Sequence, residues 1–202
     1  MPLWIDQRPL VLASKSGARR RILEAVGIPV DIRPAAINER AEEARAGAKT
    51  AEQAAHVLAQ IKAAAVSALM PGRLVLSADQ TLSLGDRRFS KPADRTAARE
   101  QLRALSGKTH RLYSAAVLMR DDTVLFDYGE AAELTMRELS DRFLEIYLDA
   151  AGEGATTSVG GYQIEATGAQ LFGGVNGDYF TILGLPLLPL LDFLRRSGLI
   201  AA

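Results

Sequence analysis

Apolar positions along this chain come in two patterns: short continuous runs, and longer stretches in which they recur every three or four residues. Short runs bounded by turn residues predict buried strands, whereas the longer repeats predict amphipathic helices. The predicted strands and hairpins cover residues 10–13, 29–33, 74–78, 82–89, 110–119, 124–136 and, after the segment 175–178, a last strand to residue 183. The predicted helices cover residues 18–26, 51–70, 95–105, 141–150 and 186–197.

Local signals mark where several of these elements begin and end. Thr50-Ala-Glu-Gln53 is a capping box, and Asp94 and Ser140 are further expected N-caps. Pro71-Gly72 ends the long helix, and residues 152–161 are expected to form a glycine-rich loop. Helices and strands alternate at first and antiparallel strands follow, so we predict an α/β fold with a mixed, twisted sheet flanked by helices. The whole chain, 1–202, is expected to be one domain.

The turn after the first strand has the features of an anion site. The strand stops at Ser14 and Ser16, and a helix then begins at Gly17. Backbone N–H groups at a helix start have no partner within the helix, and with the helix dipole they attract anions. Arg19 lies in the first turn, where cations are normally unfavourable, so a bound anion would explain it. The simpler interpretation is an ordinary helix start with solvated arginines.

Composition limits the classes of function. The chain has 24 basic and 24 acidic residues and a formal net charge of 0, which argues against nucleic-acid or membrane-surface binding. It has no cysteine, which excludes disulfides and thiolate metal sites. The N-terminus shows no signal peptide, and the longest apolar run, 182–191, is interrupted by prolines and too short to cross a bilayer. We therefore expect a soluble, cytoplasmic protein.

Four charged residues lie at the ends of predicted elements. Asp79 follows the most strand-like run, and Lys91 comes after the hairpin that returns toward it. Glu39 lies in a polar loop, and Lys62 lies on the long helix. Together with the anion site they would suit phosphate hydrolysis, since carboxylates can hold Mg²⁺ and deprotonate a water. Taken singly, each residue could equally be a cap or a solvated surface charge.

Eight motifs occur in a fixed order over residues 9–197. They are Ala13-Ser-Lys-Ser-Gly-Ala-Arg-Arg, Leu58-Ala-Gln-Ile-Lys-Ala, Ser77-Ala-Asp-Gln, Ser90-Lys-Pro, Leu105-Ser-Gly-Lys-Thr-His110, Gly161-Tyr-Gln-Ile-Glu, Asn176-Gly-Asp-Tyr and Leu183-Gly-Leu-Pro-Leu187. Each motif is weak alone, but the ordered set resembles the Maf family of nucleoside triphosphate pyrophosphatases.

The resemblance implies a two-lobed fold with a central cleft, similar to the inosine-triphosphate pyrophosphatases. It also implies hydrolysis of a nucleoside triphosphate to the monophosphate and diphosphate with Mg²⁺ or Mn²⁺. Asp79 matches the family's proton acceptor, and Glu39 and Asp79 are the expected metal ligands. Lys62 and Lys91 match its other catalytic positions, and the phosphate loop corresponds to Ser14, Ser16 and Arg19. A homodimer is the assembly expected from the resemblance.

Some residues depart from the common pattern and bear on substrate choice. Gln80 and Glu165 resemble the type that acts on 7-methyl-GTP, rather than the type that acts on dTTP and UTP. A carboxylate can accept hydrogen bonds from the guanine edge, which supports this preference. Ala18 stands where the 7-methyl-GTP type has a large aromatic residue, and Asn38 replaces an aspartate. We expect Ala18 to contact the substrate and Asn38 to weaken metal binding.

Three alternatives compete with this assignment. The substrate could be dTTP or UTP instead. The protein could be a nucleotide-binding regulator of cell division and septum formation without significant catalysis, although such a protein would not need two carboxylates and two lysines together. Nucleic-acid binding through residues 19–21 is disfavoured by the zero net charge. His56 and His110 have no partner at a metal-ligand spacing and are expected to be structural.

Overall fold

The computed structural model describes residues 3–201, and the chain falls into two compact units. The first unit contains the residues up to Gln80, the segment Ser114–Glu130 and the residues from Tyr179 onward. The second contains Thr81–Tyr113 and Ala131–Asp178. This division agrees with the two lobes expected from the sequence, while the cleft between them stays a prediction.

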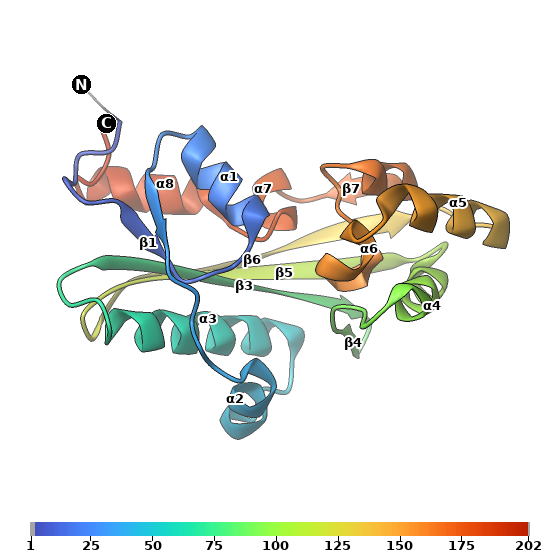
Figure 1. The fold of residues 1–202 in the computed structure, drawn as a ribbon, viewed down its shortest axis with the longest axis horizontal. Helices are drawn as coiled ribbons and strands as arrows, with labels where there is room; N and C mark the ends of the chain where they lie inside the picture. Colours follow the sequence, from blue (N-terminus) through green and yellow to red (C-terminus); the bar gives the residue numbers. More distant parts are fainter. Residues whose placement is uncertain (1–2, 202) are drawn as a thin grey trace. The chain divides into compact units, whose positions relative to one another are not determined.

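The strands form a mixed sheet, as predicted (Figure 1). They are β1 Leu10–Leu12, β2 Val30–Ile32, β3 Leu74–Leu84, β4 Arg87–Phe89, β5 Thr109–Arg120, β6 Thr123–Met136 and β7 Phe172–Asn176. Hydrogen bonds join them in the order β2-β1-β3-β5-β6-β7, with β4 paired to β3. Strand β1 is parallel to both β2 and β3, whereas β4 and β7 run antiparallel to their neighbours.

The helices begin where the sequence supplies caps. They are α1 Gly17–Ala25, α2 Glu39–Ala46, α3 Ala51–Ser67, α4 Arg95–Leu105, α5 Asp141–Ala151, α6 Gly154–Thr157, α7 Tyr179–Ile182 and α8 Leu187–Arg196, with 3₁₀ turns at Val159–Gly161 and Thr167–Leu171. Thr50 and Gln53 make the predicted capping box, and Asp94 and Ser140 cap α4 and α5. Serine, threonine and aspartate are preferred at these positions because their side chains accept from the unpaired N–H groups of the first turn, so the helix starts can be predicted from the sequence.

Side chains of the first unit's strands alternate between two helical layers. Leu10 and Leu12 belong to the core that α1 and α8 cover, whereas Val11 packs with Val66 of α3. Figure 1 shows α1 and α8 on one face of these strands and α3 on the other. The sheet-facing side of α3 is rich in alanine, including the fully buried Ala59 and Ala63. Since residues two apart in a strand share a face, each position in β3 is assigned to one of these layers.

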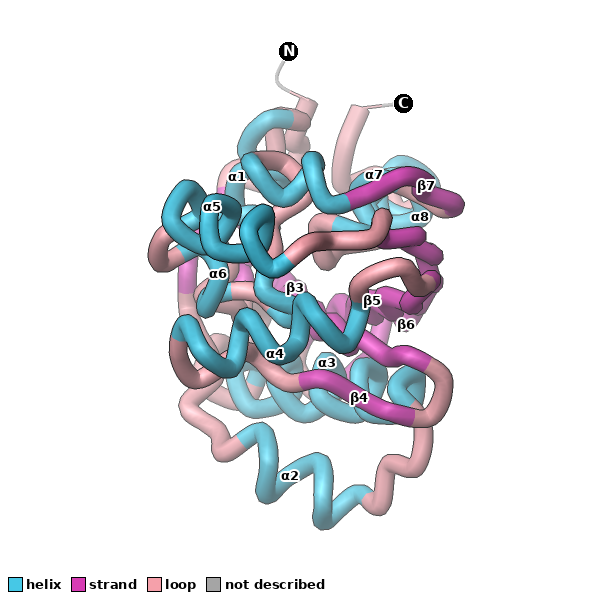
Figure 2. Tube along the Cα trace, turned by 90° about the vertical axis from the view of Figure 1, so that its right-hand side faces the viewer, coloured by secondary structure: helices cyan, strands magenta, loops and turns pink. Residues whose placement is uncertain are grey.

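The second unit combines an aromatic core with an exposed layer of ion pairs. Helix α4 packs against α5 and α6, which Figure 2 shows side by side. The rings of His110, Tyr162 and Phe172 lie within 4.9–5.9 Å of one another. Outside this core, arginines of α4 bridge acidic residues of α5, as in the pair of Arg95 with Glu145 at 2.9 Å.

Four expectations about local structure were wrong. Glu39 begins helix α2 rather than lying in a loop, because Asn38 caps the segment and its alanine, glutamate and arginine residues favour a helix. The helix was missed because the segment has no apolar repeat. Strand β3 does not end before Asp79 but continues to Leu84, since it pairs with β4 beyond that point. The stretch 152–161 holds the short helix α6 and a 3₁₀ turn instead of being a loop.

The fourth correction concerns residues 179–183, where a strand was expected. Tyr-Phe-Thr-Ile favours strands by composition, yet it forms the helical turn α7. Gly177 and Gly184 on either side have φ of +133° and +95°, backbone shapes that interrupt a strand. The strand of this region lies earlier, as β7.

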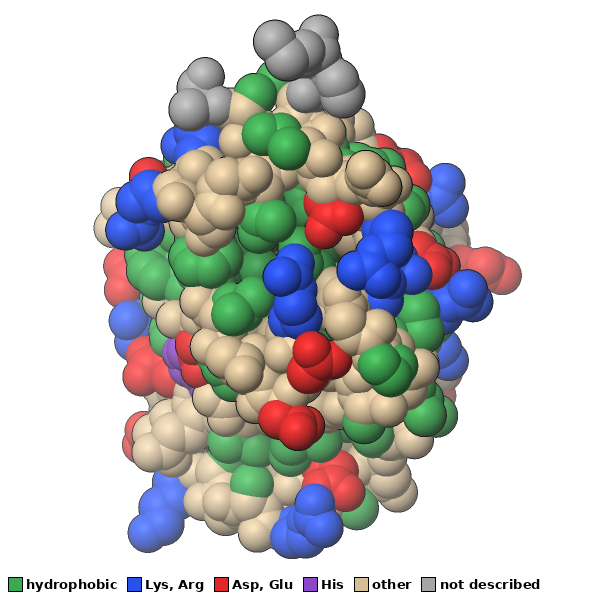
Figure 3. Space-filling view, turned by 90° about the vertical axis from the view of Figure 1, so that its left-hand side faces the viewer, with side chains coloured by type: hydrophobic (Ala, Val, Ile, Leu, Met, Phe, Trp, Pro, Cys, Tyr) green, Lys and Arg blue, Asp and Glu red, His purple; other side chains and the backbone are tan. Residues whose placement is uncertain are grey.

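Within residues 3–201, none of the helices is both long enough and apolar enough to cross a membrane. Acidic and basic side chains are interspersed on the face drawn in Figure 3 rather than gathered by sign. This distribution fits the formal net charge of 0.

Candidate active site

A lysine and two carboxylates form the centre of the site in the first unit. Lys62 Nζ lies 2.5 Å from Asp79 Oδ1 and 3.4 Å from Glu39 Oε1. The Lys62 and Asp79 side chains are only 7% and 12% exposed, whereas Glu39 is 56% exposed. Three residues predicted separately from the sequence are therefore brought together, one from α3, one from β3 and one from the start of α2.

The positions of Lys62 and Asp79 follow from periodicity. Asp79 lies four residues after Val75 in β3 and so shares its face, which is the face covered by α3. Lys62 lies four residues before Val66, on the side of α3 that packs against this face. The alternation of the strand and the repeat of the helix thus direct the two charges toward each other.

Burial sets the electrostatics of the pair. Removal from water raises the pKa of the Asp79 carboxyl above its ordinary value, and the positive charges of Lys62 and Arg19 oppose part of that rise. A buried charge needs such partners, because desolvation alone would favour the neutral form. The result is a carboxylate that can accept a proton more readily than an exposed aspartate.

The turn that precedes α1 is organised around Ser14, Ser16 and Arg19. Ser16 is the N-cap of α1, and its hydroxyl accepts from the Arg19 backbone N–H at 3.3 Å. Ser14 Oγ accepts from the Ser16 N–H at 3.2 Å and from Arg19 Nη1 at 3.1 Å. The three predicted phosphate-loop residues thus contact one another, while Arg20 pairs with Glu24 on the exposed side of the helix.

The Arg19 guanidinium is buried and bonded mainly to backbone. Nε donates to the Gly184 carbonyl at 2.7 Å, and Nη1 donates to the Ala78 carbonyl at 2.8 Å. Burial lowers its pKa, while Asp79 and Glu39 favour its charge. Arg19 therefore supplies positive charge next to Asp79 and also connects α1 to β3. Ala18, beside it, is half-buried on α1.

The Gln80 side chain donates hydrogen bonds to other residues of the first unit. Its Nε2 donates to Ser114 Oγ at 3.0 Å and to the carbonyls of Thr181 and Ile182 at 3.1 and 2.9 Å. The Asn38 side chain also has an internal partner, because its Oδ1 caps α2 by accepting from the Ala41 N–H. The role of Asn38 as a helix cap was missed in the sequence, although it is a preferred residue for that position.

Lys91 and Glu165 belong to the second unit. Lys91 is exposed just after β4, and Glu165 is exposed in the turn before the 3₁₀ segment Thr167–Leu171. Their participation in one site with Asp79 stays a prediction.

Asp79 and Glu39 suit a divalent cation by their chemistry. Their oxygens converge on one ammonium, which shows that both can reach a common positive charge. Mg²⁺ typically takes one or two carboxylates and completes its shell with waters and substrate phosphates. Across residues 3–201, no group of three or more His, Cys, Asp or Glu side chains that could hold a metal ion is found.

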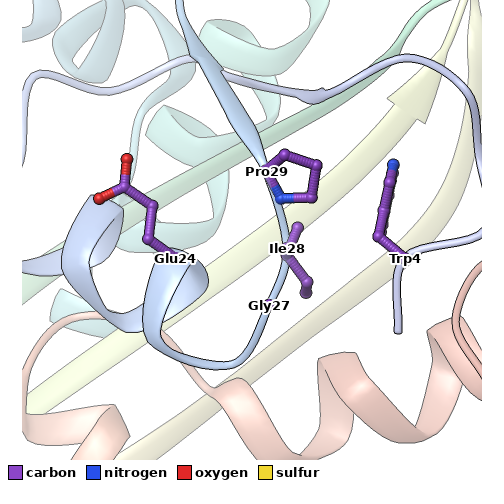
Figure 4. Close-up of a pocket in the computed structure, with 5 residues that line it drawn as sticks. All are labelled: Trp4, Glu24, Gly27, Ile28 and Pro29. Carbon is purple, nitrogen blue, oxygen red and sulfur yellow. The ribbon is translucent and has the colours of Figure 1, made fainter. Parts of the chain in front are cut away.

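The two histidines are placed as structural residues. His110 is buried, its Nε2 lies 2.7 Å from the Tyr162 hydroxyl, and burial lowers its pKa to about 4. His56 Nδ1 lies 2.9 Å from Asp127 on the outside of the first unit. A hollow of about 450 Å³ lined by Trp4, Glu24, Gly27, Ile28 and Pro29 contains none of the predicted site residues (Figure 4).

Gly184 and Thr181, which the sequence did not single out, contact two of the predicted site residues. Gly184 supplies a carbonyl to Arg19, and Thr181 supplies one to Gln80. For Gly184 the signal was present as the Leu183-Gly-Leu-Pro-Leu187 motif, but nothing local links that motif to Arg19, 165 positions earlier.

Known proteins resemble this chain along its length. Residues 9–197 match the family described as "Maf-like protein". "Nucleoside triphosphate pyrophosphatase" of Rhodopseudomonas palustris (strain BisB18) is 52% identical over 201 residues, 100% of each chain. "7-methyl-GTP pyrophosphatase" of Rhizobium etli (strain ATCC 51251 / DSM 11541 / JCM 21823 / NBRC 15573 / CFN 42) is 54% identical over 194 residues, 95% of this chain and 97% of the relative.

Solved structures give more distant matches. A "Nucleoside-triphosphatase / dITP/XTP pyrophosphatase" from Mycobacterium abscessus is 12% identical with a TM-score of 0.42, covering 95% of this chain and 96% of its own. A HAM1 protein from Coxiella burnetii is 16% identical with a TM-score of 0.38, covering 63% and 72%. The sequence match alone, over nearly the whole length, decides the assignment. The chain belongs to the Maf family.

Proposed function

We propose that this protein is a nucleoside triphosphate pyrophosphatase that releases a nucleoside monophosphate and diphosphate. The observation that carries the proposal is the buried Lys62 between Asp79 and Glu39, next to the serine–arginine turn of α1. A structural salt bridge would not require a third, exposed carboxylate or an anion-binding turn beside it. Full-length relatives that carry this activity in their names support the same conclusion.

Asp79 is the proton acceptor in the proposed reaction. Hydrolysis between the α- and β-phosphates requires a water to lose a proton as it attacks phosphorus. Burial raises the pKa of the Asp79 carboxyl, which makes it a better base than an exposed aspartate. Lys62 holds this carboxylate in place by its 2.5 Å contact and supplies positive charge near the phosphates.

The turn before α1 binds the phosphates in this proposal. A hydroxyl has one donor and two acceptor sites, and Ser14 Oγ already accepts two hydrogen bonds. Its O–H therefore remains to donate to a phosphate oxygen, beside the N-terminal end of the α1 dipole. Lys91 of the second unit is proposed to add charge to the same phosphates.

Glu39 and Asp79 would hold Mg²⁺ or Mn²⁺ when the substrate is bound. The cation would neutralise the charge that develops on the phosphates. Glu39 is the more accessible carboxylate. Because its charge is already exposed to solvent, it can exchange Lys62 for a cation as its partner. Asn38 caps α2 and so fixes where Glu39 begins that helix.

We further propose a guanine nucleotide, specifically 7-methyl-GTP, as the substrate. Glu165 offers a carboxylate that can accept from the guanine N1–H and 2-amino groups, which thymine and uracil do not match. The Rhizobium etli relative that is 54% identical carries the name of that activity. Ala18 leaves the site without the aromatic side chain that would stack on the methylated base.

The experiment is a pyrophosphate-release assay with Mg²⁺ on a panel of 7-methyl-GTP, GTP, TTP, UTP, CTP and inosine triphosphate. We expect diphosphate release to be fastest with 7-methyl-GTP. Equal activity on TTP and 7-methyl-GTP would refute the proposed substrate and leave the reaction intact. Tight nucleotide binding with no diphosphate release on any substrate would instead support a regulator without catalysis.

A further inference from the structure

The helical turn α7 and the two residues after it, Tyr179–Gly184, form a compact element that we call the α7 turn. Three backbone hydrogen bonds close it, from the N–H groups of Leu183, Gly184 and Leu185 to carbonyls of residues 179–181. A helix this short leaves most of its carbonyls to find partners elsewhere. Those partners are side chains of β3, β5 and α1 in the first unit.

Gln80 of β3 and Ser114 of β5 bind the carbonyls of the α7 turn. Gln80 Nε2 donates to Thr181 at 3.1 Å and to Ile182 at 2.9 Å, and Ser114 Oγ donates to Thr181 at 2.8 Å. The two side chains also bond each other at 3.0 Å. Because Ser114 is fully buried, this network is shielded from water and its hydrogen bonds have no easy substitute.

Arg19 binds the other end of the α7 turn. Its Nε donates to the Gly184 carbonyl at 2.7 Å, and its Nη1 donates to the Ala78 carbonyl at 2.8 Å. A Cβ on Gly184 would lie only 3.2 Å from Arg19 Nη2, and the residue has φ of +95°. The backbone conformation and the close approach of the guanidinium thus both favour glycine at this position.

These contacts bracket Asp79 on both sides along the strand. Arg19 holds the carbonyl of Ala78, immediately before Asp79, and Gln80 follows immediately after it. Consecutive strand residues point to opposite faces, so Asp79 is directed to Lys62 of α3 while Gln80 is directed to the α7 turn. The Gln80 NH2 group, which donates to two carbonyls and a hydroxyl, therefore has no donor left to offer a base.

We propose that Gln80 and Arg19 are positioning residues that hold the α7 turn against the strand carrying Asp79, and that Gln80 donates no hydrogen bond to the nucleotide base. The expected effect on turnover rests on the proposed function, whereas the hydrogen bonds that hold the α7 turn do not depend on it. These hydrogen bonds, which we call the clamp, keep Asp79 oriented toward Lys62. A small displacement of such a group lowers turnover without lowering affinity.

The clamp is tested first by hydrogen exchange, independently of activity. Gln80→Leu and Ser114→Ala should speed exchange of the amides at residues 183–185 by about 5-fold to 10-fold, since each removes bonds that hold the turn. Ser67→Ala is the matched control, because Ser67 is also buried and also donates to a backbone carbonyl, that of Asp121 at 2.8 Å. Unchanged exchange at 183–185 in both clamp variants overturns the proposal.

Kinetics then separate positioning from base recognition. Gln80→Leu and Ser114→Ala should lower kcat by about 10-fold or more with KM within about 2-fold, and by the same factor for 7-methyl-GTP and TTP. A change of about 10-fold in the ratio of kcat/KM between those nucleotides, with unchanged exchange, would show that Gln80 reads the base. If Gln80→Leu does not fold, Ser114→Ala decides by the same measurements.

Failure of the proposed function has a different signature. A wild-type protein that releases no diphosphate from any nucleotide would refute the activity, yet faster exchange at 183–185 in the variants would still establish the clamp. Gln80→Asn is a rescue test, because a shorter amide retains donors but reaches fewer carbonyls. Its kcat and exchange should both fall between those of wild type and Gln80→Leu.

Discussion

The two units use charged residues in opposite ways. In the first unit, Lys62 and Asp79 are buried and paired at 2.5 Å, with a third charge, Glu39, at the opening to solvent. In the second unit, arginines of α4 and acids of α5 make a ladder of pairs whose side chains are about half exposed. Exposed pairs gain little because water screens them, whereas a buried pair becomes costly as soon as one partner is removed. The same residue types therefore form a buried, coupled cluster in one unit and a solvated surface layer in the other.

The largest effect is expected from Asp79→Asn. Asparagine keeps the shape of the side chain but cannot accept a proton from water, so kcat should fall by at least about 10²-fold. Nucleotide binding should be retained, as measured by isothermal titration calorimetry without turnover. Circular dichroism spectra matching wild type control for folding. Turnover close to wild type would remove Asp79 from its role as the base.

Lys62→Met tests the cost of breaking the buried pair. Methionine fills a similar volume but leaves Asp79 without its nearest positive charge, so we expect a loss of about 3–5 kcal/mol in the free energy of unfolding. Urea denaturation measures this loss. The double variant Lys62→Met, Asp79→Asn should recover part of this loss, because no buried carboxylate is then left without its positive partner. An unfolding free energy within error of wild type for the single variant contradicts a buried, coupled pair.

His110 gives the second unit a pH dependence of its own. Burial lowers its pKa to about 4, so the folded protein keeps the imidazole neutral. The unfolded chain binds the proton near pH 6.5, and stability is therefore full above that pH and is lost as pH falls toward 4. From pH 8 to pH 5 we expect this residue to cost about 2 kcal/mol of unfolding free energy.

The measurement is the difference in urea stability between pH 8 and pH 5. His110→Phe should show a smaller difference than wild type, even if it is less stable at both pH values because the bond to Tyr162 is lost. His56→Phe controls for the removal of a histidine as such. An equal pH dependence in His110→Phe and wild type would disprove a buried neutral imidazole.

The smallest effect is expected from the exposed ladder. Arg95 contacts Glu145 at 2.9 Å and Asp149 at 2.8 Å, but both pairs are open to solvent. Arg95→Gln should leave the urea midpoint and the kcat unchanged within error, in low and in high salt. A loss of unfolding free energy as large as that of Lys62→Met would show that the exposed pairs stabilise the fold as strongly as the buried pair does.

The parts of the fold that local chemistry determines were predictable from sequence. The capping box at Thr50, the caps of α4 and α5 and the hairpin turns each depend on a few adjacent residues, and all were confirmed. The continuation of β3 through Asp79 was not predictable, because it depends on pairing with β4 beyond a charged position. The α7 turn was likewise missed, since its conformation depends on glycines and on distant side chains.

The site shows the same division. The ordered motifs pointed to Asp79, Glu39 and Lys62, and the structure brings these three together. The sequence could not show that the Gln80 amide bonds backbone carbonyls, because those lie about one hundred positions later, whereas the Asn38 cap bonds Ala41 three residues on and was simply missed. A residue such as Gln80, which the sequence suggests is a determinant of substrate specificity, can thus instead hold backbone segments of the fold together.

The buried alanines of α3 have a consequence for the reach of Lys62. Ala59 and Ala63 add almost no thickness between the helix and the sheet, and Lys62 lies next to them on the same turn. A lysine side chain has a limited reach, so the gap between these layers helps to decide whether its ammonium meets Asp79. Two methyl groups thus help to set the distance between Lys62 and Asp79, and a larger residue at position 59 or 63 would push the two charges apart without changing either of them.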